Sequence, residues 1–396
     1  MNFEKLEKLM NHFTDANYAP GNTMQVSLAG KEVFNYSCGY SDEKKKIKMT
    51  GNEHFFLYSC SKITTVTAAL QLLEKGAFLL DDPLYEYIPE YKEMYIKNAD
   101  GEITRATKDI KILNLFNMTA GLTYNMQTEA FELARKLTDG KMDTATVARC
   151  IAKDPLSFEP GERFQYSLCH DVLAGLVSVI TGKKFRDYVK ENIFDPLGMR
   201  DSVYHLTPEI EKNLAMQYNF IPEGTGEALD LVEAQKNGND KRGTFAEVGA
   251  KNHHILGEEY DSGGAGIITT VSDYMKLAAA LANLGLGQNG ERILSPATVE
   301  LMRTNSLNEK QMESFNWRQL RGYGYGLGVR TMIDRISGGS LSNIGEFGWG
   351  GAAGASVYID PKIGLAAVYA KHTLNPREEY YQPRVRNVLY SCLETL

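Results

Sequence analysis

Apolar residues recur with two different periods near the start of the chain, which indicates a helix, a hairpin and a second helix. Residues 2 to 13 carry apolar side chains at helical spacing, which predicts an amphipathic opening helix. Met24 to Leu28 and Lys31 to Tyr36 are predicted as two short strands joined by a tight turn. Ser61 to Lys75 again has the helical period. We expect this second helix to be buried, because its apolar face is formed by Ile63, Val66, Leu70 and Leu73.

The middle of the chain, from about residue 83 to 250, is dominated by helical periods between polar loops. Helices are predicted over Glu129 to Leu137, Thr144 to Ala152 and Asp171 to Ile180. The stretch from Pro222 to His253 is rich in Gly, Asn, Lys and Glu and has no clean period, so we expect a long surface loop there. The pattern indicates an α-rich insertion.

Strand patterns return in the last part of the chain, after a helix predicted over Ser272 to Leu284. The predicted strands are Tyr325 to Met332, Ala355 to Ile359 and Leu365 to Ala370, and a final helix is expected over Arg384 to Leu393. Strands at both ends of the chain indicate one antiparallel sheet assembled from both termini and flanked by helices. The predicted fold class is α/β plus all-α.

The length and composition change this picture in two ways. A chain of 396 residues exceeds what one core usually supports, so we expect two domains. Residues 1–82 and 255–396 are predicted to form an α/β domain, and residues 83–254 a mainly helical domain. The net charge of −7 and the absence of a long basic run argue against a nucleic-acid partner.

Targeting signals and cysteine usage favour the cytoplasm. The N-terminus lacks a basic start followed by an apolar segment, and no apolar stretch is long enough to span a bilayer. The five cysteines are scattered without a Cys-x-x-Cys pair, which fits a reducing compartment and offers no metal site. Secretion remains open if an N-terminal segment has been removed. The oligomeric state is not predictable.

The first chemical signal is Ser59-Cys60-Ser61-Lys62, at the start of the buried helix. Residues three apart share a helix face, so the Lys62 amine can lie against the Ser59 hydroxyl. A lysine that is buried beside a second cation titrates low enough to act as a base, which a free lysine cannot do at neutral pH. Alone, the same spacing also fits an ordinary helix cap.

Two further signals follow along the chain. Tyr166 stands after a Pro-Gly turn and just before a predicted helix, where a phenol can shuttle a proton in a cleft, although packing is the common role of a tyrosine. Trp349-Gly350-Gly351-Ala352 precedes a predicted strand. Glycines there allow a ligand to approach the backbone, and a backbone N–H can donate to an oxyanion. A bulge or tight turn is the alternative.

Taken together, the order and spacing of the three signals resemble those of the serine β-lactamase and penicillin-binding-protein superfamily. The resemblance is closest to its class C β-lactamase and family VIII carboxylesterase branch, and it covers roughly residues 20 to 375. Further similar segments are Asn117-Met118-Thr119-Ala120-Gly121-Leu122 and Ser262-Gly263-Gly264-Ala265-Gly266. The resemblance implies that Ser59 is the nucleophile, that Lys62 and Tyr166 transfer protons in an undetermined order, and that the N–H groups of Ser59 and Ala352 form the oxyanion hole. It implies no cofactor and no metal.

Two positions depart from the β-lactamase pattern, and both are expected in the substrate cleft with Gly350 and Gly351. Trp349 stands where the family usually has a lysine or histidine, and Leu168 stands where it usually has an asparagine. A site without that cation and that amide should bind carboxylate-bearing substrates poorly. A serine hydrolase for small neutral esters is therefore the leading hypothesis. A D-amino-acid peptidase or amidase, a weak β-lactamase and a non-catalytic ligand-binding or sensor module remain as alternatives.

Three other groups of residues offer rival chemistry. His253 and His254 are adjacent, which does not suit one metal ion, and we expect them in a surface loop. His170 and Asp171 can line the cleft, although a helix cap is the simpler role for Asp171. Cys60 and Cys169 are expected as small buried apolar residues, with a regulatory disulfide as the alternative.

Overall fold

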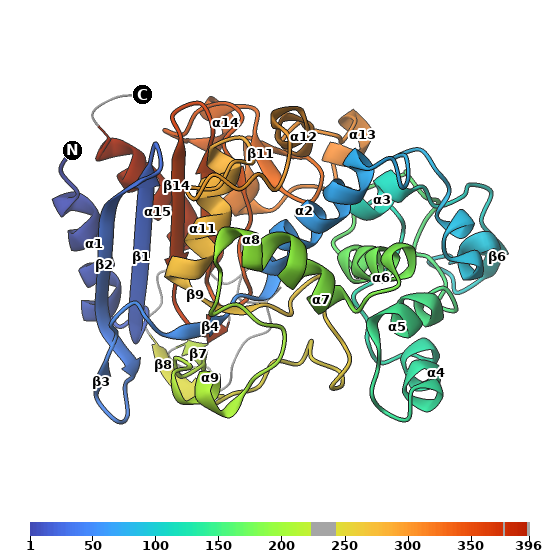
Figure 1. The fold of residues 1–396 in the computed structure, drawn as a ribbon, viewed down its shortest axis with the longest axis horizontal. Coiled ribbons are helices and arrows are strands. Elements are labelled where there is room, and N and C mark those ends of the chain that lie inside the picture. The colour runs from blue at the N-terminus through green and yellow to red at the C-terminus, as the bar shows by residue number, and fades with distance from the viewer. Residues whose placement is uncertain (223–242, 375–376, 394–396) are drawn as a thin grey trace.

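The architecture is an eight-stranded antiparallel sheet with helices on both faces and a large helical region beside it (Figure 1). The computed structural model describes residues 1–222, 243–374 and 377–393. The strand order is β10-β11-β12-β13-β14-β1-β2-β3. The strands are β1 Gly21–Leu28, β2 Lys31–Asp42, β3 Ile47–Lys48, β10 Tyr323–Tyr325, β11 Arg330–Met332, β12 Phe347–Gly348, β13 Ser356–Asp360 and β14 Leu365–Ala370.

The two ends of the chain meet in the middle of this sheet. Strand β1 pairs antiparallel with β14, and Val26 lies opposite Ala367. This confirms the predicted sheet assembled from both termini. The hairpin of β1 and β2 is also confirmed, and β2 continues past the predicted end at Tyr36 to Asp42.

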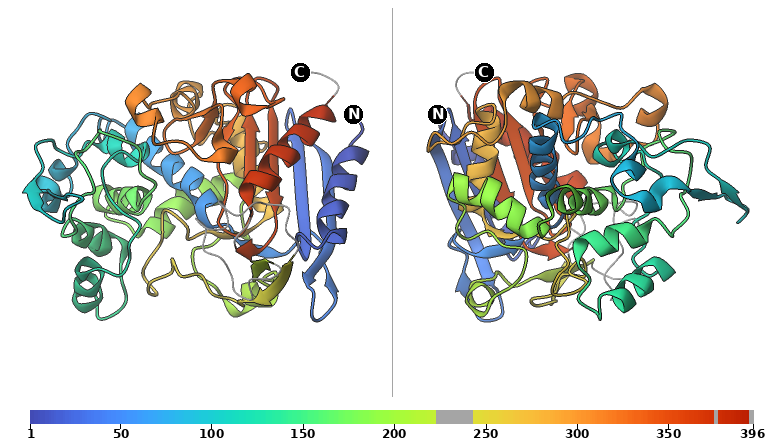
Figure 2. Two further views of the ribbon diagram at one scale, coloured as in Figure 1. Left: turned by 180° about the vertical axis from the view of Figure 1, so that it is seen from behind. Right: turned by 45° about the vertical axis from the view of Figure 1, so that its right-hand side comes forward.

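Alternation along β14 gives the sheet two apolar faces. Leu365, Ala367 and Tyr369 pack with α1 (Glu4–Asp15) and α15 (Glu378–Ser391). Ala366, Val368 and Ala370 belong to a larger core on the opposite face, where α11 (Val271–Ala282) packs against β14, β1 and β13. Figure 2 shows these helices on either side of the sheet.

The larger core continues into the helical region through α2 (Ser61–Glu74), whose residues from Ser61 to Leu72 are all buried. The prediction that one apolar face of this helix is buried is confirmed, and the other faces of α2 are buried as well. The other helices are α3 Ile112–Phe116, α4 Glu129–Leu137, α5 Thr144–Ile151, α6 Cys169–Thr181, α7 Phe185–Val189, α8 Asp195–Leu197, α9 Pro208–Lys212, α12 Pro296–Met302, α13 Glu309–Met312 and α14 Arg335–Gly338. Short turns η1 Tyr58–Cys60, η2 Leu84–Glu86, η3 Pro89–Lys92, η4 Lys190–Phe194 and η5 Arg318–Leu320 join them.

Small sheets complete the fold. Strand β4 (His54–Phe56) pairs with β9 (Ile268–Thr270), and β5 (Tyr95–Lys97) pairs with β6 (Ile103–Arg105). A three-stranded sheet joins β15 (Thr373–Leu374), β7 (Tyr218–Pro222) and β8 (Gly243–Glu247). Among the described helices, none combines the length and the apolar character that a membrane crossing requires. The division into domains at residues 82 and 254 stays a prediction.

Three sequence predictions were wrong in detail. The expected single strand from Tyr325 to Met332 is interrupted, because the chain reverses at Gly326–Gly328 and forms the antiparallel pair β10 and β11. The expected loop after Pro222 contains β8, which pairs with β7, while residues 223–242 of that prediction lie outside the described residues. The last helix starts at Glu378 rather than Arg384, with Pro383 inside it. The apolar spacing that predicted this helix begins only at Val385, whereas the first turn carries Glu378 and Glu379, which stabilise a helix N-terminus.

Candidate active site

Ser59 lies in a turn that neighbouring segments fix just before α2 begins. Strand β4 leads into η1, and the Leu57 N–H donates to the Ile267 carbonyl at 3.0 Å. Tyr58 has a φ of +46°, and its hydroxyl donates to Gln217 Oε1 at 2.5 Å. A side-chain-bearing residue adopts this left-handed conformation at a cost of about 1–3 kcal/mol, so the surrounding contacts must hold it. Ser59 itself is partly exposed at the start of the helix.

Lys62 lies one turn further along and is fully buried. Its Nζ is 3.2 Å from Ser59 Oγ, 2.8 Å from the Gly264 carbonyl oxygen and 3.3 Å from the Tyr124 hydroxyl. Burial lowers the pKa of Lys62 to about 7. A second cation was expected to lower the pKa of Lys62. The charged neighbour is instead Asp171, whose negative charge raises this pKa, so burial is the cause of the decrease. The neutral amine can donate to Gly264 and Tyr124 and still direct its lone pair at the Ser59 proton.

Asp171 supports the carbonyl that holds Lys62. Its Oδ1 accepts hydrogen bonds from Tyr260 (2.9 Å), Ser262 (2.6 Å) and the backbone N–H of Gly264 (3.3 Å). The expected capping role was wrong, because the N-cap of α6 is Leu168 and Asp171 points away into this buried network. A Cβ on Gly264 would lie 2.6 Å from Asp171 and 3.3 Å from the Lys62 amine. Glycine is therefore required for the close approach.

Tyr166 faces Ser59 and Lys62 from the loop before α6. The Lys62 amine lies 4.6 Å from the centroid of the Tyr166 ring, and Trp349 Nε1 donates to the Tyr166 hydroxyl at 3.2 Å. The two aromatic rings are stacked with centroids 5.7 Å apart. Burial raises the pKa of Tyr166, and the side chains of Ser59 and Trp349 act in the opposite direction. The phenol is therefore protonated at neutral pH and can donate a proton.

Tyr124 lies beside Lys62, and His254 packs behind Tyr124. The Tyr124 ring stacks on Tyr166 with centroids 5.6 Å apart, and His254 packs edge-on against Tyr124 and Tyr58. Burial lowers the pKa of His254 to about 4, so its imidazole is neutral. His253 is exposed, as expected of a surface loop, and His254 lies in the same loop with its ring partly buried against Tyr124 and Tyr58.

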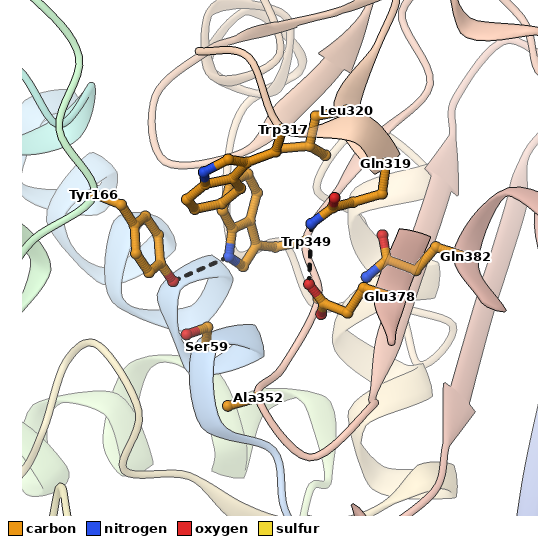
Figure 3. Close-up of a pocket in the computed structure, with 10 residues that line it drawn as sticks. Ser59, Tyr166, Trp317, Gln319, Leu320, Trp349, Ala352, Glu378 and Gln382 are labelled. Carbon is orange, nitrogen blue, oxygen red and sulfur yellow. Dashed lines mark hydrogen bonds between the residues drawn. The ribbon is translucent and has the colours of Figure 1, made fainter. Parts of the chain in front are cut away.

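A pocket of about 220 Å³ opens beside Ser59 and Tyr166 (Figure 3). Trp349 forms its middle, with Ser59 and Tyr166 on one side and Glu378 on the other. The remaining lining residues are Trp317, Gln319, Leu320, Gly350, Ala352 and Gln382. The pocket is mostly apolar, with polar groups gathered at the end formed by α15.

The glycine segment brings a backbone donor to the same pocket. Ala352 lines the pocket with Ser59, and among the described contacts its N–H donates to no protein acceptor. Gly350 also lines the pocket, whereas Gly351 is buried behind it, with its Cα facing the Leu57 carbonyl. Leu168 lies in the hydrophobic core at the start of α6 and not on the pocket wall. The assignment of the Ser59 and Ala352 N–H groups to an oxyanion hole stays a prediction.

The rival candidates lie apart from this pocket. His170 is buried in α6, its Nε2 lies 3.2 Å from the Phe116 carbonyl oxygen, and burial lowers its pKa to about 3. Cys60 and Cys169 are buried free thiols, as expected, and burial raises the pKa of both. The Cys169 thiol accepts a hydrogen bond from Ser167.

Sequence reasoning missed several residues of the site. Tyr124 follows the Gly121-Leu122 segment that carries part of the family resemblance, so its position was a usable signal. Trp317 and Gln319 come from a segment without a clear period. Glu378 and Gln382 were missed because the last helix was expected to begin after them.

Comparison with known proteins agrees with this fold. The sequence profile of the Beta-lactamase family matches residues 6–390. Esterase EstB of Burkholderia gladioli is 27% identical over 88% of this chain and 84% of its own. The solved structure of EstCE1, described as a hydrolase with promiscuous acyltransferase activity, is 25% identical, covers 98% of both chains and has a TM-score of 0.76. Simvastatin synthase LovD from Aspergillus terreus shares the fold at 20% identity, with a TM-score of 0.75 over 99% of this chain and 98% of its own.

The fold thus defines a protein of the serine β-lactamase and penicillin-binding-protein type. The chain belongs to the Beta-lactamase family, whose fold it has over nearly its whole length. Esterase, acyltransferase and amidase proteins occur among its relatives and structural neighbours.

Proposed function

We propose that this protein is a serine hydrolase that forms an acyl-enzyme on Ser59 and releases the acyl group to water, with small neutral esters as substrates. The observation that carries the proposal is the 3.2 Å separation of Ser59 Oγ from a buried lysine amine whose pKa is about 7. A base with a pKa near the working pH is well matched to proton transfer from a serine hydroxyl.

The opposite pKa shifts of Lys62 and Tyr166 support a division of the proton steps between them. Neutral Lys62 takes the proton of Ser59 while Oγ attacks the ester carbonyl carbon, and the oxyanion is met by the N–H groups of Ser59 and Ala352. Collapse of the tetrahedral intermediate breaks the carbon–oxygen bond of the ester. Protonated Tyr166 gives its proton to the departing alkoxide and is re-protonated from the Lys62 ammonium. Pairs of titratable groups whose pKa values are pushed apart are typical of such a division of roles.

Deacylation repeats these roles with water in the place of the Ser59 hydroxyl. Water attacks the acyl carbon and its proton passes to the Lys62 amine. The bond between the acyl carbon and Ser59 Oγ then breaks, Oγ takes a proton from Tyr166, which is re-protonated from the Lys62 ammonium, and the carboxylic acid leaves. No step requires a cofactor or a metal ion.

The preference for esters over β-lactams rests on the pocket wall. The indole N–H of Trp349 donates to the Tyr166 hydroxyl, and the ionisable side chain at the far end of the pocket is the acid Glu378. A substrate carboxylate would be desolvated there without a cation to pair with it. The relationship to esterase EstB and EstCE1 supports the same preference.

The test is hydrolysis of p-nitrophenyl acyl esters beside a chromogenic cephalosporin, by the wild type and by Ser59→Ala. We expect ester turnover that disappears in the variant and little cephalosporin turnover. Ester turnover that persists in Ser59→Ala contradicts the proposed nucleophile. If the wild type is inert toward both substrates, the peptidase, amidase and binding-module alternatives take precedence.

A further inference from the structure

The far end of the pocket carries chemistry that ester hydrolysis itself does not use. Glu378 of α15 lines the pocket together with Trp317 and Trp349, on the side opposite Ser59 (Figure 3). Its Oε2 accepts a hydrogen bond from Gln319 Nε2 at 3.3 Å. The pocket therefore presents one carboxyl group and two indole rings within the same small volume.

Gly350 lies directly against this end of the pocket. A Cβ at residue 350 would lie 2.7 Å from Glu378 Oε1 and 2.4 Å from Gln382 Nε2. The strand segment that carries Trp349 and the first turns of α15 therefore pack closely here, with the Glu378 carboxyl group at the pocket wall.

The surroundings of Glu378 disfavour its charged form. Burial raises the pKa of Glu378 to about 7, and the neighbouring charge of Glu379 adds to this effect. The hydrogen bond from Gln319 and the charges of Arg330 of β11 and Lys371, just after β14, act in the opposite direction. Tyr166 and Cys60 lie close enough to Glu378 for its charge to act on them, but burial raises the pKa of both, so both stay neutral. A cation bound in the pocket would favour the ionised carboxylate.

Indole rings are the aromatic groups that attract cations best, and a quaternary ammonium with methyl groups matches an aromatic surface next to a carboxylate. We infer that this pocket binds an alkylammonium group, and that the protein prefers esters that carry such a group to their neutral isosteres. Glu378 is then a specificity-determining residue. The inference rests on the proposed function, and it extends the substrate range from neutral esters to cationic ones.

Binding can be measured without catalysis, because both tryptophans of the chain, Trp317 and Trp349, line this pocket. Intrinsic fluorescence of the Ser59→Ala variant is titrated with choline and with its neutral isostere 3,3-dimethylbutan-1-ol. We expect choline to bind about tenfold more tightly at pH 8. The preference should fall to within about twofold when Glu378→Gln is added, and it should persist with Glu379→Gln, the matched control on the same helix turn.

Two further measurements test the same inference: the pH dependence of choline binding and the hydrolysis of a cationic and a neutral thioester. Without any change at residue 378, the preference for choline should decline as the pH falls through about 7, because Glu378 becomes protonated. In the wild type, acetylthiocholine should be hydrolysed with about tenfold higher kcat/KM than 3,3-dimethylbutyl thioacetate. Equal affinity for the two alcohols, or a preference that survives Glu378→Gln, overturns the inference. Failure to hydrolyse either thioester while choline is still preferred counts against the proposed hydrolase function and not against the ammonium site.

Discussion

The indole N–H of Trp349 donates a hydrogen bond to the phenol oxygen of Tyr166 at 3.2 Å, while the two rings stack on each other. The residue that departs most clearly from the β-lactamase pattern is therefore bonded to the proposed proton donor. Since this bond opposes the increase in the pKa of Tyr166 that burial causes, Trp349 adjusts the acidity of the phenol as well as forming the pocket wall.

Replacement of Trp349 by phenylalanine should separate these two roles. The ring remains available for stacking, but the N–H donor is lost, so the pKa of Tyr166 rises and proton delivery to the alkoxide slows. We expect kcat for a poor alkoxide leaving group to fall about fivefold, which corresponds to the loss of about 1 kcal/mol for one hydrogen bond. Esters of p-nitrophenol, whose leaving group needs little protonation, should be much less affected. Trp317→Phe is the control, because no hydrogen bond from Trp317 to Tyr166 occurs among the described contacts; an equal, leaving-group-dependent loss there contradicts this role.

The acidity of Lys62 fixes the pH dependence of acylation. Its pKa is lowered to about 7, so the amine is protonated and inactive as a base below that pH, and neutral above it. We expect kcat/KM for neutral esters to rise with pH and to level off above an apparent pKa of about 7. Measurement of kcat/KM from pH 5 to 9 tests this. A flat profile, or one that falls with pH across this range, rules out Lys62 as the base.

Asp171 gives a sharper test of the same assignment. Its charge raises the pKa of Lys62, so Asp171→Asn should move the acidic limb of the pH profile to lower pH. The asparagine oxygen can still accept hydrogen bonds from Tyr260 and Ser262, which preserves part of the buried network. A purely structural defect would lower kcat/KM at every pH without moving the limb, and that outcome would separate Asp171 from the control of Lys62.

Stability should depend strongly on a buried ion pair away from the pocket. Glu346 is fully buried, accepts hydrogen bonds from Arg330 at 3.1 Å and Tyr323 at 2.6 Å, and lies directly before β12. Glu346→Ala leaves the Arg330 charge buried without its partner and should lower the free energy of unfolding by about 3–5 kcal/mol. The control Glu300→Ala breaks an exposed pair with Arg303 and should cost less than about 1 kcal/mol. Urea denaturation of both variants measures the difference; similar costs would contradict the account.

The fold was predictable where local patterns and tertiary burial agree. The apolar run of β14 and the helical period of α4 gave their bounds directly, since β14 is buried along its whole length and α4 buries one apolar face. Prediction failed where long-range contacts decide. Residues Gly243–Glu247 form a strand because β7 is available to pair with them, and Glu378 joins the pocket because α15 packs beside Gly350.

The site shows the same division. Ser59 and Lys62 are three residues apart where η1 leads directly into α2, so sequence spacing alone brings them together. Gly264 and Tyr124 contact Lys62 from separate loops, and Asp171 of α6 holds Gly264. The family resemblance covers the segments next to Tyr124 and around Gly264, but no helical or strand period places them at Lys62. Closeness in sequence can also mislead. Leu168 was expected in the substrate cleft because it lies next to the tyrosine motif, but its side chain lies in the hydrophobic core at the start of α6.

The central claim is that the acyl group is carried on Ser59, and rapid-quench mass spectrometry tests it most directly. Wild-type protein is mixed with a p-nitrophenyl ester, quenched in acid during the burst of nitrophenol release, and digested for peptide mapping. We predict one acyl adduct, on the peptide that contains Ser59, and no adduct or burst in Ser59→Ala. An adduct on another residue, or continued turnover with Ser59 unmodified at every quench time, would contradict the account.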